Sequence, residues 1–249
     1  MSDYDQGMTA ATCSILCGHL FVERGEYHMI HIDEYICQLT DLLKMSFGAR
    51  LVYVGLQGSY LRGEATNHSD IDIMVVVDGL SVDDLEVYRR TIESMEHANK
   101  SCGFICSRRD LMNWNPLEIG NLLNGTKDYF GVLKDLVPAF TEADIRNFIK
   151  LSINNIYHEI CHRYIHAAPQ INTAHLPGTY KGVFFILQNL YYLEHDVFVG
   201  SKAELLDLLD GKDKNVLERA IDLNHGAACD FRDSFELLFT WCQETLERL

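Results

Sequence analysis

The chain has 249 residues and a formal net charge of −15 at pH 7, and hydrophobic residues make up 47% of it. A surface this acidic argues against a broad grip on the phosphate backbone of DNA or RNA, and no apolar stretch approaches the roughly 20 residues that span a membrane. The first residues lack the basic and apolar regions of a signal peptide, and the eight cysteines include no C-x-x-C pair, so we expect a cytoplasmic protein with reduced thiols.

The first half of the chain mixes helical and strand-like patterns. Apolar residues recur at helical spacing over residues 10–47 with one break, which predicts two helices. Residues 51–56 predict a buried strand, and residues 70–77 predict a central strand that is apolar on both faces apart from its acidic start. A helix over residues 81–97, with Ser81 as its N-cap, and a shorter strand over residues 102–107 follow.

The second half has helical periodicity. After a loop at residues 113–116, nearly everything from Leu117 onward predicts helix. We expect a long helix with Thr141 as its N-cap that runs to residue 166, a proline-bounded separator over 169–177, a helix over 180–195, and a helix opened by a capping box of Ser201 and Glu204. The predicted fold class is α+β: a small mixed-sheet domain over residues 1–125, N-terminal helices included, and then an α-helical bundle domain over residues 126–249.

The run from Gly58 to Asp72 carries the most specific chemistry. Asp70 and Asp72 are one residue apart on an expected strand and therefore point to the same face. Two like charges that close together repel unless a cation lies between them. The preceding Gly58-Ser59 turn offers backbone N–H groups and a hydroxyl to an anion. A simple Asx-type turn would explain Asp70 but not a second carboxylate inside an apolar strand, so the run predicts a site for a magnesium nucleoside triphosphate.

The order and spacing of these residues resemble a known superfamily. Gly-Ser, ten intervening residues and Asp-x-Asp between two apolar strands is similar to the nucleotidyltransferase superfamily, which includes DNA polymerase β, the minimal nucleotidyltransferases and the aminoglycoside and lincosamide nucleotidyltransferases. Arg62 and Gly63 also match the pattern Gly-Ser-aromatic-x-Arg-Gly that is often seen there. The close match covers residues 52–77, and beyond it a small α/β domain followed by helices is similar to the organisation of kanamycin-type enzymes.

The resemblance implies roles for five residues. Asp70 and Asp72 would bind Mg²⁺, as the catalytic metal ligands. Gly58 and Ser59 would hold the β- and γ-phosphates of the nucleotide, and Arg62 could add a charged hydrogen bond to phosphate. A solvated loop is the alternative for Arg62 and for its neighbour Glu64.

The chain also departs from the family pattern. Active members usually carry a third carboxylate on a later strand, which here should fall within residues 104–107, and none of these is acidic. Asp110 could be a third metal ligand or could simply belong to a helix N-terminus. From the helical half, kanamycin-type enzymes supply a general base and a phosphate contact, for which the candidates here are Glu159 and Lys181. A solvated helix face is the alternative for Glu159, and a snorkelling surface lysine is the alternative for Lys181.

Three histidines, His158, His162 and His166, recur every four residues and form one stripe on the expected long helix. Histidines at this spacing can bind zinc, but no His-Glu-x-x-His motif is present, so a row of partly buried or cleft-lining histidines is the preferred interpretation.

The leading functional hypothesis is an enzyme that moves a nucleoside monophosphate, AMP from ATP, to a hydroxyl of a small molecule that resembles an aminoglycoside. One alternative is transfer to a protein side chain of a partner toxin. Another is a nucleotide-binding regulatory protein without transfer activity, which the missing third carboxylate would favour. A homodimer is compatible with each of these.

Overall fold

The structure is a computed structural model that describes residues 30–228 and 230–249. Residues His31–Leu249 form one compact unit. The second of the two helices expected over residues 10–47 is present as α1 (Ile32–Phe47), and the first lies outside the described residues. No helix within the described part of the chain is long and apolar enough to cross a membrane.

A four-stranded mixed sheet organises the first half of the described chain. Its strands are β1 (Leu51–Leu56), β2 (Ile71–Val77), β3 (Ser101–Ser107) and β4 (Lys127–Phe130), in the order β3-β2-β1-β4. β2 is parallel to β3, whereas β1 is antiparallel to both β2 and β4. The predicted α+β class with a small mixed sheet is thereby confirmed.

The strand β4 corrects the prediction that nearly everything after Leu117 is helical. It pairs Phe130 with Val54 and Lys127 with Leu56 at the edge of the sheet, and its first two residues are exposed. An edge strand is held by main-chain hydrogen bonds on one side and commonly carries charged residues, so it shows no alternating apolar pattern. The sheet therefore continues past residue 125, where the sequence analysis began the helical domain, and the position of the domain boundary stays a prediction.

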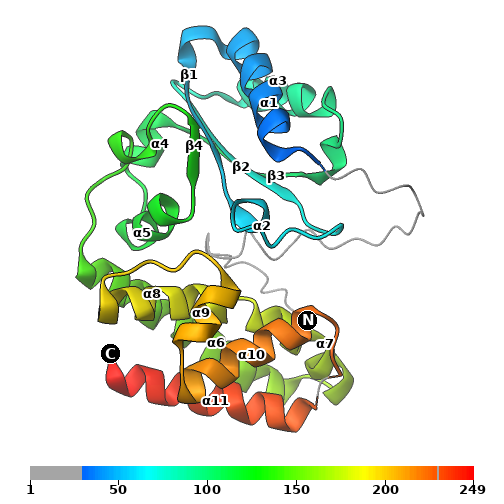
Figure 1. The fold of residues 1–249 in the computed structure, drawn as a ribbon, viewed down its shortest axis with the longest axis vertical. Coiled ribbons are helices and arrows are strands. Elements are labelled where there is room, and N and C mark those ends of the chain that lie inside the picture. The colour runs from blue at the N-terminus through cyan, green and yellow to red at the C-terminus, as the bar shows by residue number, and fades with distance from the viewer. Residues whose placement is uncertain (1–29, 229) are drawn as a thin grey trace, which may run out of the picture. The chain divides into compact units, whose positions relative to one another are not determined.

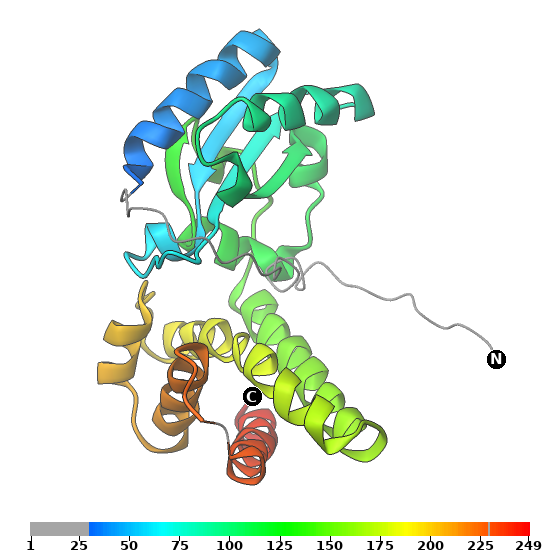
Figure 2. The ribbon, with the colours of Figure 1, turned by 90° about the vertical axis from the view of Figure 1, so that its right-hand side faces the viewer.

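Helices cover both faces of the sheet (Figures 1 and 2). On one face α1 packs against α3 (Val82–Glu93) and β1, and short 3₁₀ turns over Gly48–Arg50 and Ala98–Lys100 lead into β1 and β3. On the other face lie α4 (Arg108–Met112), α5 (Pro116–Asn124) and a 3₁₀ turn over Leu133–Asp135, packed on alternate strand residues that include Tyr53, Met74, Val76 and Cys106. Because side chains alternate along β2, Asp72 faces the same side as Met74.

The helix predicted over residues 81–97 starts where expected but ends earlier. Ser81 is its N-cap as predicted, in a capping box with Asp84. The helix ends at Glu93, with Ser94 as its C-cap, and His97 has a left-handed backbone conformation, with φ +61°, that is incompatible with a helix continuing through it.

The second half is a helical bundle. Its helices are α6 (Glu142–His166), α7 (Pro169–Tyr180), α8 (Val183–His195), α9 (Lys202–Leu208), α10 (Gly211–Asn224) and α11 (Phe231–Arg248). A stripe of isoleucines on α6 forms the centre of the core together with α8 and α11: Ile145, Ile149, Ile153, Ile156 and Ile160. Thr141 caps α6 as predicted, in a capping box with Asp144, and Ser201 Oγ accepts the hydrogen bond of the Glu204 N–H at the start of α9.

The proline-bounded segment is a helix, which corrects its interpretation as a separator. Pro169 occupies the first turn of α7, where no N–H is needed and the fixed φ suits a helix. Pro177 lies one turn from the end of α7, and Leu176 beside it is buried in the bundle core. Tertiary packing therefore holds a helix across a proline that sequence rules treat as a boundary.

Candidate active site

The Gly58-Ser59 turn is a short helix that packs directly on Asp72. The helix, α2 (Gly58–Leu61), follows β1, and the Gln57 N–H before it donates to the Asp72 carbonyl oxygen at 2.8 Å. Gly58 has φ +70°, and a Cβ built on it would lie 1.9 Å from Asp72 Oδ2. Only glycine allows both this backbone conformation and this approach. The fold thus brings together the turn and the carboxylate that the sequence analysis paired.

Asp70 and Asp72 flank the start of β2, and both are partly exposed. Burial raises the pKa of the Asp72 carboxyl, and the charge of Asp70 raises it further, while the charge of Arg62 and a hydrogen bond from Cys102 act in the opposite direction. The ionised pair is therefore electrostatically unfavourable by itself, and a bound cation would relieve it.

The position beside Asp72 on the neighbouring strand is Cys102. In the parallel register of β2 and β3, Asp72 pairs with Cys102, whose side chain hydrogen-bonds to the carboxylate. Residues 104–107, within which a third carboxylate is expected, pair with residues 74–77 farther along β2. The side chain beside Asp72 on β3 is therefore a thiol, which the sequence could not show without the strand register.

Asp110 does not approach this site. It follows Ser107, the last residue of β3, whereas Cys102 lies near the start of that strand, so the strand between them spans roughly 16 Å. The Asp110 carboxylate accepts the Ser107 N–H at 3.1 Å, and the Asp110 N–H donates to Ser107 Oγ at 3.0 Å. Asp110 is thus part of the capping box of α4, which accounts for its carboxylate.

Arg62 and Glu64 belong to a partly buried ionic cluster rather than to a solvated loop. Arg62 Nε donates to Glu64 Oε2 at 3.0 Å, and the two side chains are 17% and 20% exposed. Lys202 donates its backbone N–H to Glu64 Oε1 at 2.6 Å and its Nζ to Glu64 Oε2 at 2.9 Å. The guanidinium of Arg62 and the Nζ of Lys202 both lie over the ring of Phe184, at 5.6 and 5.2 Å from its centre.

Sequence reasoning missed Lys202, although one signal was available. A lysine in the first turn of a helix opposes the helix dipole, so it suggests an anionic partner from elsewhere in the fold. That partner, Glu64, is 138 positions away in the sequence, and no local pattern could identify it.

The structure does not join the other two helical-half candidates to the Asp72 site. Glu159 accepts a hydrogen bond from Thr179 Oγ1 at 3.1 Å and pairs with Arg163 at 3.0 Å, both within the bundle. Lys181 is exposed at the C-cap of α7, immediately before α8.

The histidine stripe lies on the exposed face of α6, which corrects its interpretation as a partly buried or cleft-lining row. His158, His162 and His166 follow one another with ring centres 6.0 and 4.8 Å apart. Among the residues that the structure describes, no group of three or more His, Cys, Asp or Glu side chains could hold a metal ion. A metal at the Asp70–Asp72 pair would therefore need ligands from the nucleotide and from water.

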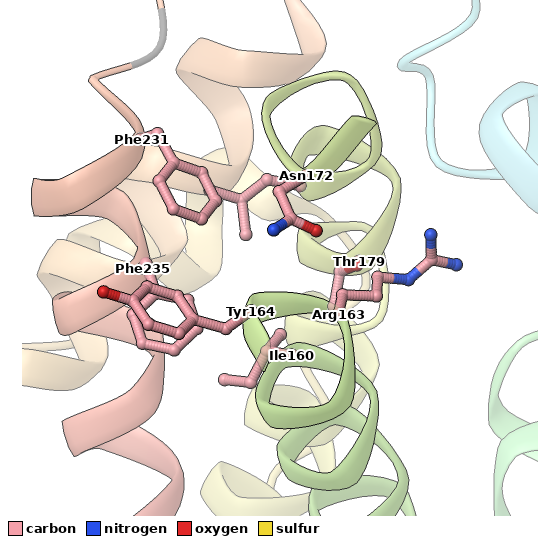
Figure 3. Close-up of a pocket in the computed structure, with 8 residues that line it drawn as sticks. Ile160, Arg163, Tyr164, Asn172, Thr179, Phe231 and Phe235 are labelled. Atoms are coloured by element: carbon pink, nitrogen blue, oxygen red, sulfur yellow. The ribbon is translucent and has the colours of Figure 1, made fainter. Parts of the chain in front are cut away.

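A small cavity lies between α6, α7 and α11 (Figure 3). Aromatic side chains of Tyr164, Phe231 and Phe235 close one side of it, and the guanidinium of Arg163 points away from it. Its volume is about 10 Å³, which is room for about one water molecule. It is therefore too small to hold a nucleotide or an acceptor.

The fold and the site define a class of protein. Residues 36–118 match the family model for the nucleotidyltransferase domain, a range that includes the Gly58-Ser59 turn, both aspartates and Cys102. The chain therefore contains a nucleotidyltransferase domain over these residues, which supports a transferase enzyme.

Among solved structures, the chain is similar to the spectinomycin adenyltransferase AAD(9) from Enterococcus faecialis, crystallised with ATP and spectinomycin. The TM-score is 0.55 at 14% sequence identity, and the similarity covers 86% of this chain and 98% of that chain, so the two share a fold across the sheet and the bundle. No curated protein shows significant sequence similarity to the chain.

Proposed function

We propose that the protein transfers AMP from ATP, with Mg²⁺ as the cofactor, to a hydroxyl group of a small molecule that resembles an aminoglycoside. The observation that carries this proposal is the packing of Gly58 on the Asp72 carboxylate, with Asp70 and Arg62 close enough for their charges to act on Asp72. The turn can bind the phosphates of the nucleotide, and the neighbouring carboxylates can bind the metal ion that accompanies them.

The residues present fit Mg²⁺. The two carboxylates at the start of β2 supply the hard oxygen ligands that this ion prefers, and Mg²⁺ normally keeps further positions for phosphate oxygens and water. Burial and the charge of Asp70 raise the pKa of Asp72, and a bound divalent cation would lower that pKa again by stabilising the ionised carboxylates. When bound, the ion would neutralise phosphate charge and hold the reacting groups in line.

The chain's own residues would bind and orient the nucleotide. Gly58 and Ser59 start a helical turn, so their N–H groups and the Ser59 hydroxyl would donate to phosphate oxygens. Arg62 has two terminal nitrogens besides the Nε that Glu64 engages, and these can donate to phosphate. The proposal does not depend on Asp110, Glu159 or Lys181.

Two observations support a small acceptor. The structurally similar adenyltransferase was crystallised with ATP and spectinomycin, and its similarity extends over the helical half, where an acceptor site can be built. The net charge of −15 favours a cationic acceptor over an anionic one.

Pyrophosphate release from ATP tests the proposal. Purified protein with Mg²⁺, ATP and a panel of aminoglycoside and aminocyclitol acceptors should release pyrophosphate only with a suitable acceptor, and mass spectrometry should find AMP on that acceptor. The double variant Asp70→Asn, Asp72→Asn should abolish release. A mass increase on a protein instead would replace the small acceptor by a protein side chain. ATP binding with no release under any of these conditions would refute transfer.

A further inference from the structure

The side chain of Glu64 joins the phosphate-binding turn to the helical half of the chain. The Glu64 N–H donates to the Ser59 carbonyl oxygen at 2.9 Å, so its backbone is fixed to that turn. Its carboxylate accepts the backbone N–H and the Nζ of Lys202, at 2.6 and 2.9 Å, at the first residue of α9. The same carboxylate accepts Arg62 Nε at 3.0 Å.

This cluster differs from an ordinary surface ion pair. Exposed pairs contribute little because water competes with them and both side chains lose freedom. Here the Glu64 carboxylate accepts three donors and is 20% exposed, and Phe184 lies under both cations. Burial alone would raise the pKa of Glu64, but the hydrogen bonds from Lys202 and Arg62 outweigh it and lower the pKa. The carboxylate is therefore held in its ionised form by the two cations.

The arrangement places positive charge near the Asp72 carboxylate. Burial and the charge of Asp70 raise the pKa of Asp72, and the charge of Arg62 opposes them, so the guanidinium that Glu64 engages also lies within electrostatic reach of the Asp72 carboxylate. Glu64 engages the Nε of Arg62, and the outer nitrogens of a guanidinium then have a fixed direction, because the group is planar.

We propose that Glu64 is a positioning residue for the triphosphate: it holds Arg62 and Lys202 beside the Ser59 turn, so that both cations meet the β- and γ-phosphates without rearrangement. This inference rests on the proposed nucleotide site, and it adds a residue that does not touch the nucleotide. Binding is strengthened when charged donors are already fixed in the bound geometry.

Calorimetric titration of three ligands tests the inference: ATP with Mg²⁺, AMP, and inorganic tripolyphosphate. Glu64→Gln should weaken ATP and tripolyphosphate binding roughly tenfold to hundredfold, as loss of charged hydrogen bonds does, and should leave AMP binding unchanged. Glu86→Gln, which removes the carboxylate of an exposed pair with Arg89, is the matched control and should change none of the three.

A double-mutant cycle separates positioning from general structure. If Glu64 acts through Arg62 and Lys202, Glu64→Gln should weaken tripolyphosphate binding much less in an Arg62→Met, Lys202→Met background than in the native chain. Equal losses in both backgrounds, an equal loss for AMP, or tighter ATP binding from the removed negative charge would each overturn the inference. Thermal unfolding of each variant shows whether the fold persists.

The outcome for transfer is read separately. Tripolyphosphate binding that depends on Glu64, without AMP transfer to any acceptor, would support the inference and refute the proposed reaction. Transfer that is unaffected by Glu64→Gln would do the reverse. A native chain that binds neither ATP nor tripolyphosphate would refute both.

Discussion

Replacing Gly58 by alanine tests the contact on which the site is built. An ideal Cβ at this position would lie 1.9 Å from Asp72 Oδ2 and 2.7 Å from Asp72 Cγ. To reach an ordinary contact distance of 3.4 Å, the carboxylate would have to move by about 1.5 Å. A displacement of about 1 Å at a reacting centre can reduce activity roughly a hundredfold, and we expect a loss of that order for Gly58→Ala in metal-dependent ATP binding and in transfer.

The same substitution also strains the backbone. Alanine at φ +70° should destabilise the fold by about 1–2 kcal/mol, which lowers the melting temperature by roughly 2–8 °C for a chain of this size. Gly79→Ala is the matched control, because Gly79 has φ +60° in the turn after β2 and no atom lies within 4 Å of its ideal Cβ. The two variants should lose similar stability, and only Gly58→Ala should lose ATP binding.

Titration calorimetry with ATP and Mg²⁺, together with thermal unfolding, measures both effects. The reasoning is refuted if Gly58→Ala binds ATP as well as Gly79→Ala does. It is also refuted if both variants lose binding equally, because strain rather than contact with Asp72 would then be the cause.

Three further predictions concern charges in the sheet domain. Asp72→Asn should abolish Mg²⁺-dependent ATP binding and yet raise the melting temperature at pH 7. The pKa of Asp72 is raised in the folded state, so its ionised form opposes folding, and the stability of the wild type falls as pH rises through that pKa. Cys102→Asp should tighten Mn²⁺ binding roughly tenfold in titrations, about 1.4 kcal/mol, by adding a third carboxylate, and uncharged Cys102→Asn should not. Hydrogen bonds from Arg50 and Ser81 lower the pKa of Asp84, so its ionised form stabilises the fold above pH 3.8, and this stabilisation is lost as pH falls through the folded-state pKa. The urea midpoints of Asp84→Asn and the wild type should therefore differ at pH 7 and converge in acid.

The strands that build the site could be predicted from the sequence because their apolar runs are local signals. β1 has the predicted bounds, and β2 begins one residue after the predicted start. β4 could not be predicted in this way, because its residues Lys127 and Asp128 are exposed and only pairing with β1 makes it a strand. The helix α7 was missed because proline rules describe local backbone preference, whereas burial of Leu176 depends on the bundle.

The contacts of the candidate site also divide into local ones, which the sequence could predict, and long-range ones, which it could not. Gly58 and Asp72 lie fourteen positions apart, in a turn and in the strand that follows it, and their contact follows from this local arrangement of consecutive elements. The contact of Cys102 with Asp72 depends on the register of two parallel strands joined by a helix, which no pattern within either strand specifies. The contact of Glu64 with Lys202 spans 138 positions, and its prediction would require the packing of the helical half.

Charge near the turn decides whether a nucleotide can bind to a chain this acidic. The net charge of −15 repels a polyphosphate, but at physiological salt, charges beyond about 8 Å are largely screened. Near the turn, Arg62 and Lys202 supply two positive charges, while Glu64, Asp70 and Asp72 supply three negative ones, of which Mg²⁺ would offset the charges of the two aspartates. A carboxylate that only reduced the local positive charge would weaken phosphate binding. Its three hydrogen bonds and its attachment to Ser59 are therefore better explained by the fixed direction that it gives to the two cations than by neutralisation.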